Sequence, residues 1–166
     1  MRPQSFATTL LASTATVSPE VSRIRDSPQL EPSKTEGRIC VRRSPINGKG
    51  CFALVLLAAR KSFGEFIGEK ISAREAGRRV ARGGKISICD LDDRWSIDAS
   101  RSGKPTAFIN HSCAPNSFMR VAQGKILFYA LRDIPGGEEI TLDYTPSQHP
   151  GRPCTCRAPG CHGVMR

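Results

Sequence analysis

A polar stretch near the middle of the chain combines side chains that can bind or react. Asn110-His111-Ser112-Cys113 follows the apolar pair Phe108-Ile109, and Asn116 comes shortly after it. A hydrophobic core has no need of these groups, but a site that hydrogen-bonds a polar ligand beside apolar walls does. We therefore expect residues 108–116 to form part of a binding site.

Four cysteines offer a metal site. Cys113 in the polar stretch is matched by Cys154, Cys156 and Cys161 near the C-terminus. Four thiolates are the ligand set of a closed structural zinc site. The chain has seven cysteines, an odd number, so a disulfide framework would leave one of them unpaired. We predict Zn²⁺ on these four thiols in a reducing compartment, with free thiols as the alternative and His162 as a weaker substitute ligand.

Short strands separated by turn signals must position these groups. We expect strands over residues 38–43, 51–57, 63–71 and 139–144, and hairpins that pair 85–89 with 94–98 and 117–121 with 125–131. A capping box, Ser72-Ala73-Arg74-Glu75, and a Gly83-Gly84 stop predict one helix over 73–82. The pattern is β-rich (α+β) and lacks the βαβ alternation of a Rossmann-type methyltransferase. The remaining cysteines lie in apolar stretches and are predicted to be buried: Cys40, Cys51 and Cys89.

The charge of the chain is uneven. Residues 37–85 hold twelve basic residues against three acidic ones, whereas residues 1–36 are neutral and residues 86–166 have a net charge of +1. The first 36 residues are rich in Ser, Thr and Pro, which is typical of a disordered tail. Their first nineteen residues lack acids and carry Arg2, which leaves a transit peptide as the alternative. No apolar run reaches the length of a membrane span.

Five motifs occur in order along residues 37–166. They are Gly48-Lys49-Gly50-Cys51-Phe52-Ala53, Glu65-Phe66-Ile67-Gly68-Glu69, Asn110-His111-Ser112-Cys113, Gly137-Glu138-Glu139-Ile140-Thr141-Leu142-Asp143-Tyr144 and the cysteine cluster of residues 154–161. A Gly-x-Gly sequence alone indicates only a turn between strands. Together and in this order, the motifs resemble those of the SET-domain protein-lysine methyltransferases.

The resemblance implies a fold and a division of the chain. The expected SET fold has small curled antiparallel sheets and a C-terminal segment threaded in a knot-like way under a loop, an exception to the usual rule on chain crossings. We expect a disordered tail over residues 1–36, a SET catalytic domain over 37–149 and a post-SET zinc segment over 150–166.

The resemblance also implies an activity, the transfer of methyl groups from S-adenosylmethionine to a lysine of a histone or another protein. By this resemblance, Asn110 would bind the amino-acid end of the cofactor, His111 would contact the adenine side through its backbone, and Met165 would pack on the adenine. The site residues implied are Lys49, Gly50, Asn110, His111 and Met165 for the cofactor, Tyr144 for catalysis, Phe66 and Leu142 for the substrate channel, and Cys113, Cys154, Cys156 and Cys161 for zinc.

Methyl transfer of this kind is an in-line displacement that needs a neutral amine. Free lysine titrates near pH ~10.4, and a narrow apolar channel lowers that value by desolvation. The hydroxyl of Tyr144 would orient the amine, and alignment of the two substrates would supply most of the acceleration. Leu142 leaves an apolar space beside the amine, which favours the addition of more than one methyl.

Some positions depart from the family pattern. Phe66 stands where many members carry tyrosine, Ala107 where they often have arginine, and Lys104 where they often have asparagine. These departures favour an alternative function, a cofactor- or peptide-binding SET-fold module with little turnover. A second alternative is a basic, zinc-containing protein that binds nucleic acid or chromatin, which explains the charge but not the order of the motifs.

The partners follow from the implied activity and the charge. We expect a protein substrate with a target lysine, contact of the basic 37–85 region with a nucleosome or nucleic acid, no membrane, and a monomer. A solvated basic face is the alternative explanation of the charge. A reducing compartment, cytoplasmic or nuclear, suits the free thiols. No flanking region looks like a chromatin-reading domain, which favours a compact stand-alone enzyme.

Overall fold

The computed structural model describes residues 37–144 and 151–165. Within them the strands are short and one α-helix forms, as the strand-rich pattern predicts. The tail predicted over residues 1–36 and the boundary predicted after residue 149 lie outside the described residues. In the described part of the chain, no helix has the length and apolar character needed to cross a membrane.

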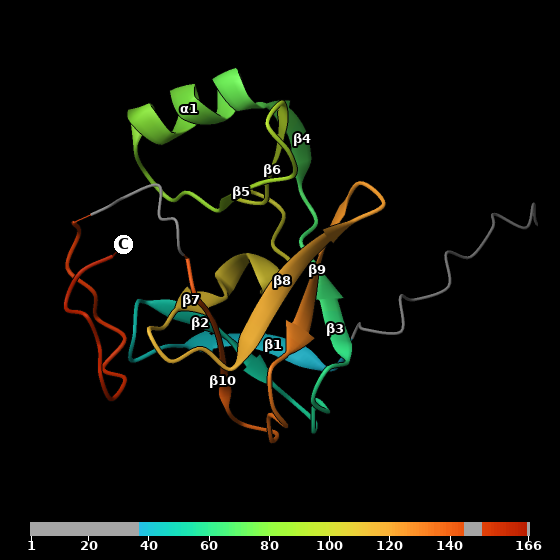
Figure 1. The fold of residues 1–166 in the computed structure, drawn as a ribbon, viewed down its shortest axis with the longest axis vertical. Coiled ribbons are helices and arrows are strands. Elements are labelled where there is room, and N and C mark those ends of the chain that lie inside the picture. The colour runs from blue at the N-terminus through green and yellow to red at the C-terminus, as the bar shows by residue number, and fades with distance from the viewer. Residues whose placement is uncertain (1–36, 145–150, 166) are drawn as a thin grey trace, which may run out of the picture. The chain divides into compact units, whose positions relative to one another are not determined.

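Three small sheets build the described fold (Figure 1). The first has the order β1 (Ile39–Arg43), β2 (Lys49–Ala53), β10 (Glu139–Leu142) and β7 (Asn110–His111). The second has the order β3 (Ser62–Glu65), β9 (Lys125–Ala130) and β8 (Ser117–Ala122), and the third β4 (Glu69–Ser72), β6 (Trp95–Asp98) and β5 (Ile88–Asp90). The helix α1 (Ala73–Arg82) and the 3₁₀ turn η1 (Pro105–Phe108) complete it. The β-rich SET fold class is confirmed; the predicted knot-like threading stays a prediction.

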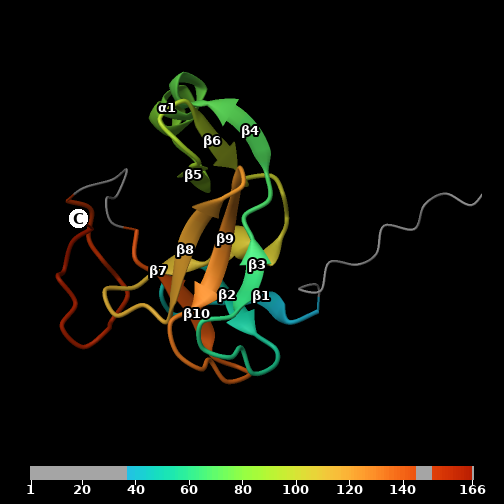
Figure 2. The ribbon, with the colours of Figure 1, turned by 45° about the vertical axis from the view of Figure 1, so that its right-hand side comes forward.

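The hydrophobic core draws on the first and second sheets and on Ile97 of the third. Figure 2 shows the ribbon of the second sheet beside that of the first. Cys51 and Ile140 of the first sheet and Ile126 of the second are fully buried. The ring of Phe63 stacks on that of Phe128 with 6.1 Å between centroids. Burial of this apolar surface holds the two sheets together and fixes β10, the strand that leads to Tyr144.

Local signals placed the helix correctly. Ser72 caps α1 by accepting a hydrogen bond from the amide of Glu75 at 3.2 Å. The helix ends at Gly83, whose φ of +74° suits a residue without a side chain. Only Ala76 of the helix is buried, so α1 is a surface helix, as its basic residues predict.

The hairpins also follow local signals. Gln123 and Gly124 between β8 and β9 have φ values of +52° and +71°, the left-handed pair that a tight two-residue turn requires. The β5–β6 pair forms as predicted, but β5 begins at Ile88 and not at residue 85. Ser87 is engaged elsewhere: its amide donates to Ser100 Oγ at 2.9 Å and its hydroxyl to the carbonyl of Ala107 at 3.0 Å.

Two predicted strands are shorter than expected. The strand predicted over 51–57 starts at Lys49 and ends at Ala53, after which Leu54 to Leu56 lie exposed in a loop. The stretch 63–71 divides into β3 and β4, which belong to different sheets. The chain changes sheet near Gly68, where an added Cβ would lie 2.2 Å from the carbonyl oxygen of Asp98. Gly68 therefore permits a close backbone approach that no periodicity reveals.

Burial of the three isolated cysteines is confirmed only in part. Cys51 has no exposed surface, whereas Cys40 and Cys89 are half-buried. Burial raises the pKa of Cys51 to about 12 and that of Cys89 to about 11. These thiols therefore stay protonated at neutral pH and behave as small apolar side chains.

Candidate functional site

The polar stretch around Asn110 lies beside β10. Asn110 aligns with Thr141 and His111 with Leu142 in the parallel pairing of β7 and β10. The amide of Ser112 then donates to the carbonyl of Leu142 at 2.9 Å. This pairing brings the polar stretch next to Tyr144, which lies 33 positions from His111 in the sequence.

The side chain of Asn110 is almost completely buried, with 9% of its surface exposed. Its Nδ2 lies 2.8 Å from Oε1 of Glu139, 3.0 Å from the carbonyl of Lys49 and 3.1 Å from Oγ of Ser44. The amide therefore connects β7, β10 and the start of β2. Sequence reasoning assigned Asn110 to the site but missed Ser44 and Glu139.

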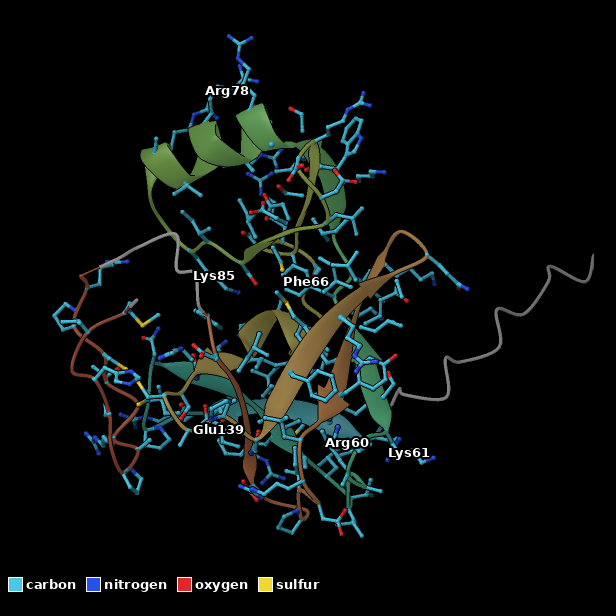
Figure 3. All side chains as sticks on the ribbon, viewed as in Figure 1. Arg60, Lys61, Phe66, Arg78, Lys85 and Glu139 are labelled. Carbon is cyan, nitrogen blue, oxygen red and sulfur yellow. The ribbon has the colours of Figure 1, made fainter. Side chains whose placement is uncertain are left out.

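Glu139 explains why position 50 is a glycine. A Cβ added at Gly50 would lie 2.2 Å from Oε1 of Glu139 and 3.0 Å from Cβ of Ser44. The carboxylate thus occupies the space that a side chain at position 50 would need. Glu139 projects from β10 toward this network (Figure 3). The resemblance assigned Gly50 to cofactor binding. In the structure, the space beside Gly50 is filled by the carboxylate of Glu139.

The imidazole of His111 joins the cysteine cluster to Tyr144. Its Nδ1 accepts a hydrogen bond from the amide of Tyr144 at 3.1 Å, so the neutral ring carries its proton on Nε2. That nitrogen lies 3.4 Å from Sγ of Cys113. Burial lowers the pKa of His111, while the carboxylate of Asp143 at 3.7 Å opposes the shift. The side chain of His111 therefore holds the backbone of Tyr144 in place, a role that the motif alone did not indicate.

Tyr144 has an exposed flank and an engaged hydroxyl. About 40% of the residue is exposed, yet its hydroxyl donates a hydrogen bond to the carbonyl of Ile109. Burial of the phenol group, with a smaller effect of Cys89, raises the pKa of Tyr144 to about 12. The ring lies 5.5 Å from that of His111, centroid to centroid. At neutral pH the hydroxyl is protonated and fixed in direction.

The other predicted site residues lie in different surroundings. Leu142 is 9% exposed and lies in β10, two residues before Tyr144. Phe66 is buried in the core against the ring of Phe128, at 6.1 Å between centroids (Figure 3). Lys49 presents its carbonyl to Asn110 while its side chain is exposed. Met165 is half-buried, and its amide and carbonyl bond to residues 152 and 151.

The four predicted zinc ligands come together. The sulfur atoms of Cys113, Cys154, Cys156 and Cys161 all lie within 4.8 Å of one another. Cys113 Sγ lies 3.8 Å from that of Cys154 and 3.9 Å from that of Cys161. Sulfurs at about 2.3 Å from a tetrahedral zinc ion are about 3.8 Å apart. The cluster therefore fits a four-thiolate metal site, and its four cysteines are free thiols in the structure.

These thiols do not ionise alike. Burial raises the pKa of Cys154 to about 12. Burial also favours a higher pKa for Cys156. Hydrogen bonds from the amides of Cys113 and Ala158 and from neighbouring thiols outweigh this effect and lower the pKa of Cys156 to about 6. One thiolate forms readily, and further negative charges in the same cluster need a cation to balance them.

The C-terminal segment 151–165 has little regular structure. It is closed by a bridge between Pro153 and Val164. Thr155 Oγ1 donates to the carbonyl of Ile46 at 2.8 Å, which places the segment against the loop before β2. Cys156 is its one buried apolar residue within the described range. A metal on the four cysteines would supply the stability that a core does not.

Comparison with known proteins agrees with this geometry. The chain is 40% identical over 138 residues to the histone-lysine N-methyltransferase set1 of Dictyostelium discoideum, covering 77% of this chain and 9% of that protein. It is 38% identical over 132 residues to the H3 lysine-4 specific histone-lysine N-methyltransferase of Schizosaccharomyces pombe, covering 74% of this chain and 14% of that protein. The protein of the same name in Saccharomyces cerevisiae is 33% identical over 146 residues, covering 80% and 14%.

The chain thus spans about a tenth of the length of these curated relatives. A model of the SET domain matches residues 48–145, a range that includes Gly50, Asn110, Glu139 and Tyr144. With the fold, the parallel β7–β10 pairing and the four-cysteine cluster, this match identifies the chain as a member of the SET-domain family.

Proposed function

We propose that the protein is an S-adenosylmethionine-dependent protein-lysine N-methyltransferase that acts on a histone. The observation that supports this most is the placement of Tyr144, whose amide is held by His111 and whose hydroxyl is directed by Ile109. This tyrosine follows two residues after β10, the strand that pairs with the Asn110 stretch. The relatives whose names state a histone-lysine N-methyltransferase activity support the substrate class.

The residues around Asn110 fit a polar cofactor. Lys49, Gly50, Asn110 and His111 would hold S-adenosylmethionine, with Met165 on its adenine. When bound, S-adenosylmethionine supplies a methyl group activated by a positively charged sulfur. The buried amide of Asn110 is the kind of group that orients such a ligand.

Tyr144 would orient the lysine amine. Its hydroxyl proton is directed at the carbonyl of Ile109, so the lone pairs of the oxygen remain to accept a hydrogen bond from the amine. A pKa of about 12 keeps the phenol neutral, which makes it a poor general base at neutral pH. Its contribution is alignment, and the lysine must lose its proton by desolvation or to water before it reacts.

The four cysteines would hold one structural Zn²⁺ that orders the segment carrying Met165. Phe66 and Leu142 would border the lysine channel. The S. pombe and S. cerevisiae relatives are named as specific for lysine 4 of histone H3, and for this chain histone H3 is the substrate to test first. A histone substrate implies work in the nucleus on chromatin, where the basic residues 37–85 would contact nucleosomal DNA, and the protein would act as a monomer.

Substitution of the tyrosine tests the proposal. Tyr144→Phe should abolish most turnover while leaving cofactor affinity nearly unchanged, because it removes only the hydroxyl that aligns the amine. Methylation of histone H3 and of nucleosomes with labelled S-adenosylmethionine, read by mass spectrometry, measures turnover. Calorimetry with S-adenosylhomocysteine measures binding.

The chain contains its own control. Tyr129, the only other tyrosine, stacks on Phe118 in the β8–β9 hairpin, and Tyr129→Phe should retain activity. A wild-type protein that binds the cofactor but methylates neither H3 nor any protein of a cell lysate would favour the binding-module alternative. An active Tyr144→Phe protein would show that the assigned role of the hydroxyl is wrong.

A further inference from the structure

The amide of Asn110 has one orientation that its neighbours allow. Three oxygen atoms surround its Nδ2, from Glu139, Lys49 and Ser44, at 2.8 to 3.1 Å. The carboxylate and the backbone carbonyl can only accept hydrogen bonds. Rotation of the amide by 180° would place Oδ1 against these two acceptors and would lose both bonds. The nitrogen must therefore face the network and the oxygen must face away from it.

The oxygen of Asn110 is left open. Within residues 37–144 and 151–165 every buried side-chain nitrogen or oxygen has a hydrogen-bond partner, whereas the bonds of Asn110 all use Nδ2. Oδ1 has no partner there, so this atom must be accessible to solvent or to a ligand. A residue that is 91% buried thus presents a single hydrogen-bond acceptor to a ligand.

Glu139 holds this orientation together with the carbonyl of Lys49. Its two oxygens accept from Ser44 Oγ at 2.7 and 2.9 Å, and Ser44 Oγ in turn accepts from the amide of Ile46 at 2.9 Å. The carboxylate is thereby anchored to the loop before β2, in the space that Gly50 leaves empty. Among the ion pairs of the described residues, none includes Glu139. Its negative charge is available to a cationic ligand group.

We infer that Glu139 is a positioning residue for the donor site. It directs Asn110 so that Oδ1 accepts a hydrogen bond from a cationic amine of the ligand, and its own charge favours that amine. The inference rests on the proposed function, in which the amine is the α-ammonium group of S-adenosylmethionine. An open acceptor backed by a carboxylate suits an ammonium group and repels a carboxylate. The site should therefore select the amino group of the ligand.

Two inert ligands that differ only in this group give a direct test. S-adenosylhomocysteine carries the α-ammonium group, and its deaminated analogue has hydrogen in that place. Wild-type protein should bind S-adenosylhomocysteine about tenfold or more tightly than the analogue, as expected for a charge-assisted hydrogen bond in a buried site. In Glu139→Gln the preference should shrink by about tenfold, chiefly through weaker binding of S-adenosylhomocysteine. Calorimetry on the full chain measures both affinities.

The neighbouring residue supplies a matched control. Glu138 bonds to Arg132 and Asn116, away from the Asn110 network, and Glu138→Gln should keep the wild-type preference. Circular dichroism verifies that each variant is folded. If Glu139→Gln does not fold, Ser44→Ala replaces it, because loss of the anchoring hydroxyl should reduce the same preference.

The outcomes separate this inference from the proposed function. A preference unchanged in Glu139→Gln, or equal losses of affinity for both ligands, would overturn the positioning role. A wild-type protein that binds both ligands equally would overturn it too, while leaving the proposed methyltransferase intact. A wild-type protein that binds neither ligand would overturn both.

Discussion

At the scale of single residues, supporting side chains fix the residues of the candidate site in place through hydrogen bonds. His111 accepts from the amide of Tyr144 and reaches the sulfur of Cys113. Asn110 is held by Glu139 and Ser44. The residues of the motifs were identifiable because five motifs occur together, but their supports were not. Ser44 and Glu139 are 95 positions apart, and no spacing rule connects them.

In the proposed methyltransferase, residue 142 is expected to set the number of methyl groups transferred. Leu142 cannot hydrogen-bond a water molecule beside the amine, so a methylated amine would have room to turn and react again. Wild-type protein should therefore form di- or trimethyl-lysine, and Leu142→Tyr should shift the product toward monomethyl-lysine without loss of cofactor affinity. Mass spectrometry of the peptide product at saturating cofactor measures this ratio.

Leu54 provides the control for this substitution. It is 43% exposed in the loop after β2, so Leu54→Tyr should leave the product ratio unchanged. Exclusively monomethylated product from wild-type protein would refute the role given to Leu142. So would a Leu142→Tyr variant with the wild-type product ratio.

At the scale of elements, one arginine fastens α1 to its sheet. Arg79 lies 2.6 Å from Asp98 of β6, 2.8 Å from Glu69 of β4 and 3.0 Å from Glu75 of its own helix. Since Ala76 is the one buried residue of α1, burial of apolar surface contributes little to its attachment. The ion-pair network therefore links the helix to the β4-β6-β5 sheet, beside the hydrogen bond from the amide of Ala73 to the carbonyl of Arg94.

This network should make α1 sensitive to acid. Hydrogen bonds from Arg79 lower the pKa of Glu69 and Glu75. Burial opposes the shift at Asp98, but hydrogen bonds from Ser100 and Arg79 lower its pKa overall. Carboxyl groups with lowered folded-state pKa values stabilise the fold above their ordinary pKa values, near 4.5 for Glu and 3.8 for Asp. That stabilisation is lost as the pH falls through the lowered values.

Hydrogen exchange can measure this loss locally. Between pH 5 and pH 2.5, amides of α1 should lose protection before those of β9, after correction for intrinsic exchange rates. In Arg79→Gln, the amides of α1 should exchange quickly already at neutral pH, and their protection should no longer depend on acid. Arg78→Gln is the control, because Arg78 points away from the sheet (Figure 3) and its one ion pair within the described residues is with Glu75 at the surface. Simultaneous loss of protection in α1 and β9 would contradict a local role.

At the scale of the whole molecule, the cysteine cluster ties together distant parts of the chain. Cys113 follows β7, and its three partners lie 41 to 48 positions later. The segment 151–165 also touches the loop before β2 through Thr155. The cluster thus connects the C-terminal segment to the region of the proposed cofactor site.

Purified protein should contain about one zinc ion per chain, as a four-thiolate site requires. A chelator should release it, unfold the C-terminal segment and abolish binding of S-adenosylhomocysteine. Elemental analysis, hydrogen exchange and calorimetry measure these three effects. Cys40→Ser is the control, since Cys40 lies in β1 outside the cluster. Full retention of zinc by a Cys154→Ser, Cys156→Ser double variant would exclude this site.

Features with a local physical cause were predictable from the sequence. The bounds of α1 follow from a capping serine before it and a glycine after it, which act within one turn. The β8–β9 hairpin follows from two turn residues with positive φ. The gathering of the four cysteines was predictable because thiols at short spacing have few other uses, and the family was predictable because its motifs keep their order.

Other features depend on contacts between segments that the sequence does not relate. The division of residues 63–71 between two sheets follows from the close approach of Gly68 to Asp98. The burial of Phe66 in the core follows from its packing on Phe128. The orientation of Asn110 follows from a carboxylate on β10 and a hydroxyl before β2. Tertiary structure decided these features because hydrogen bonds and packing act over a few ångströms in space, whatever the separation along the chain.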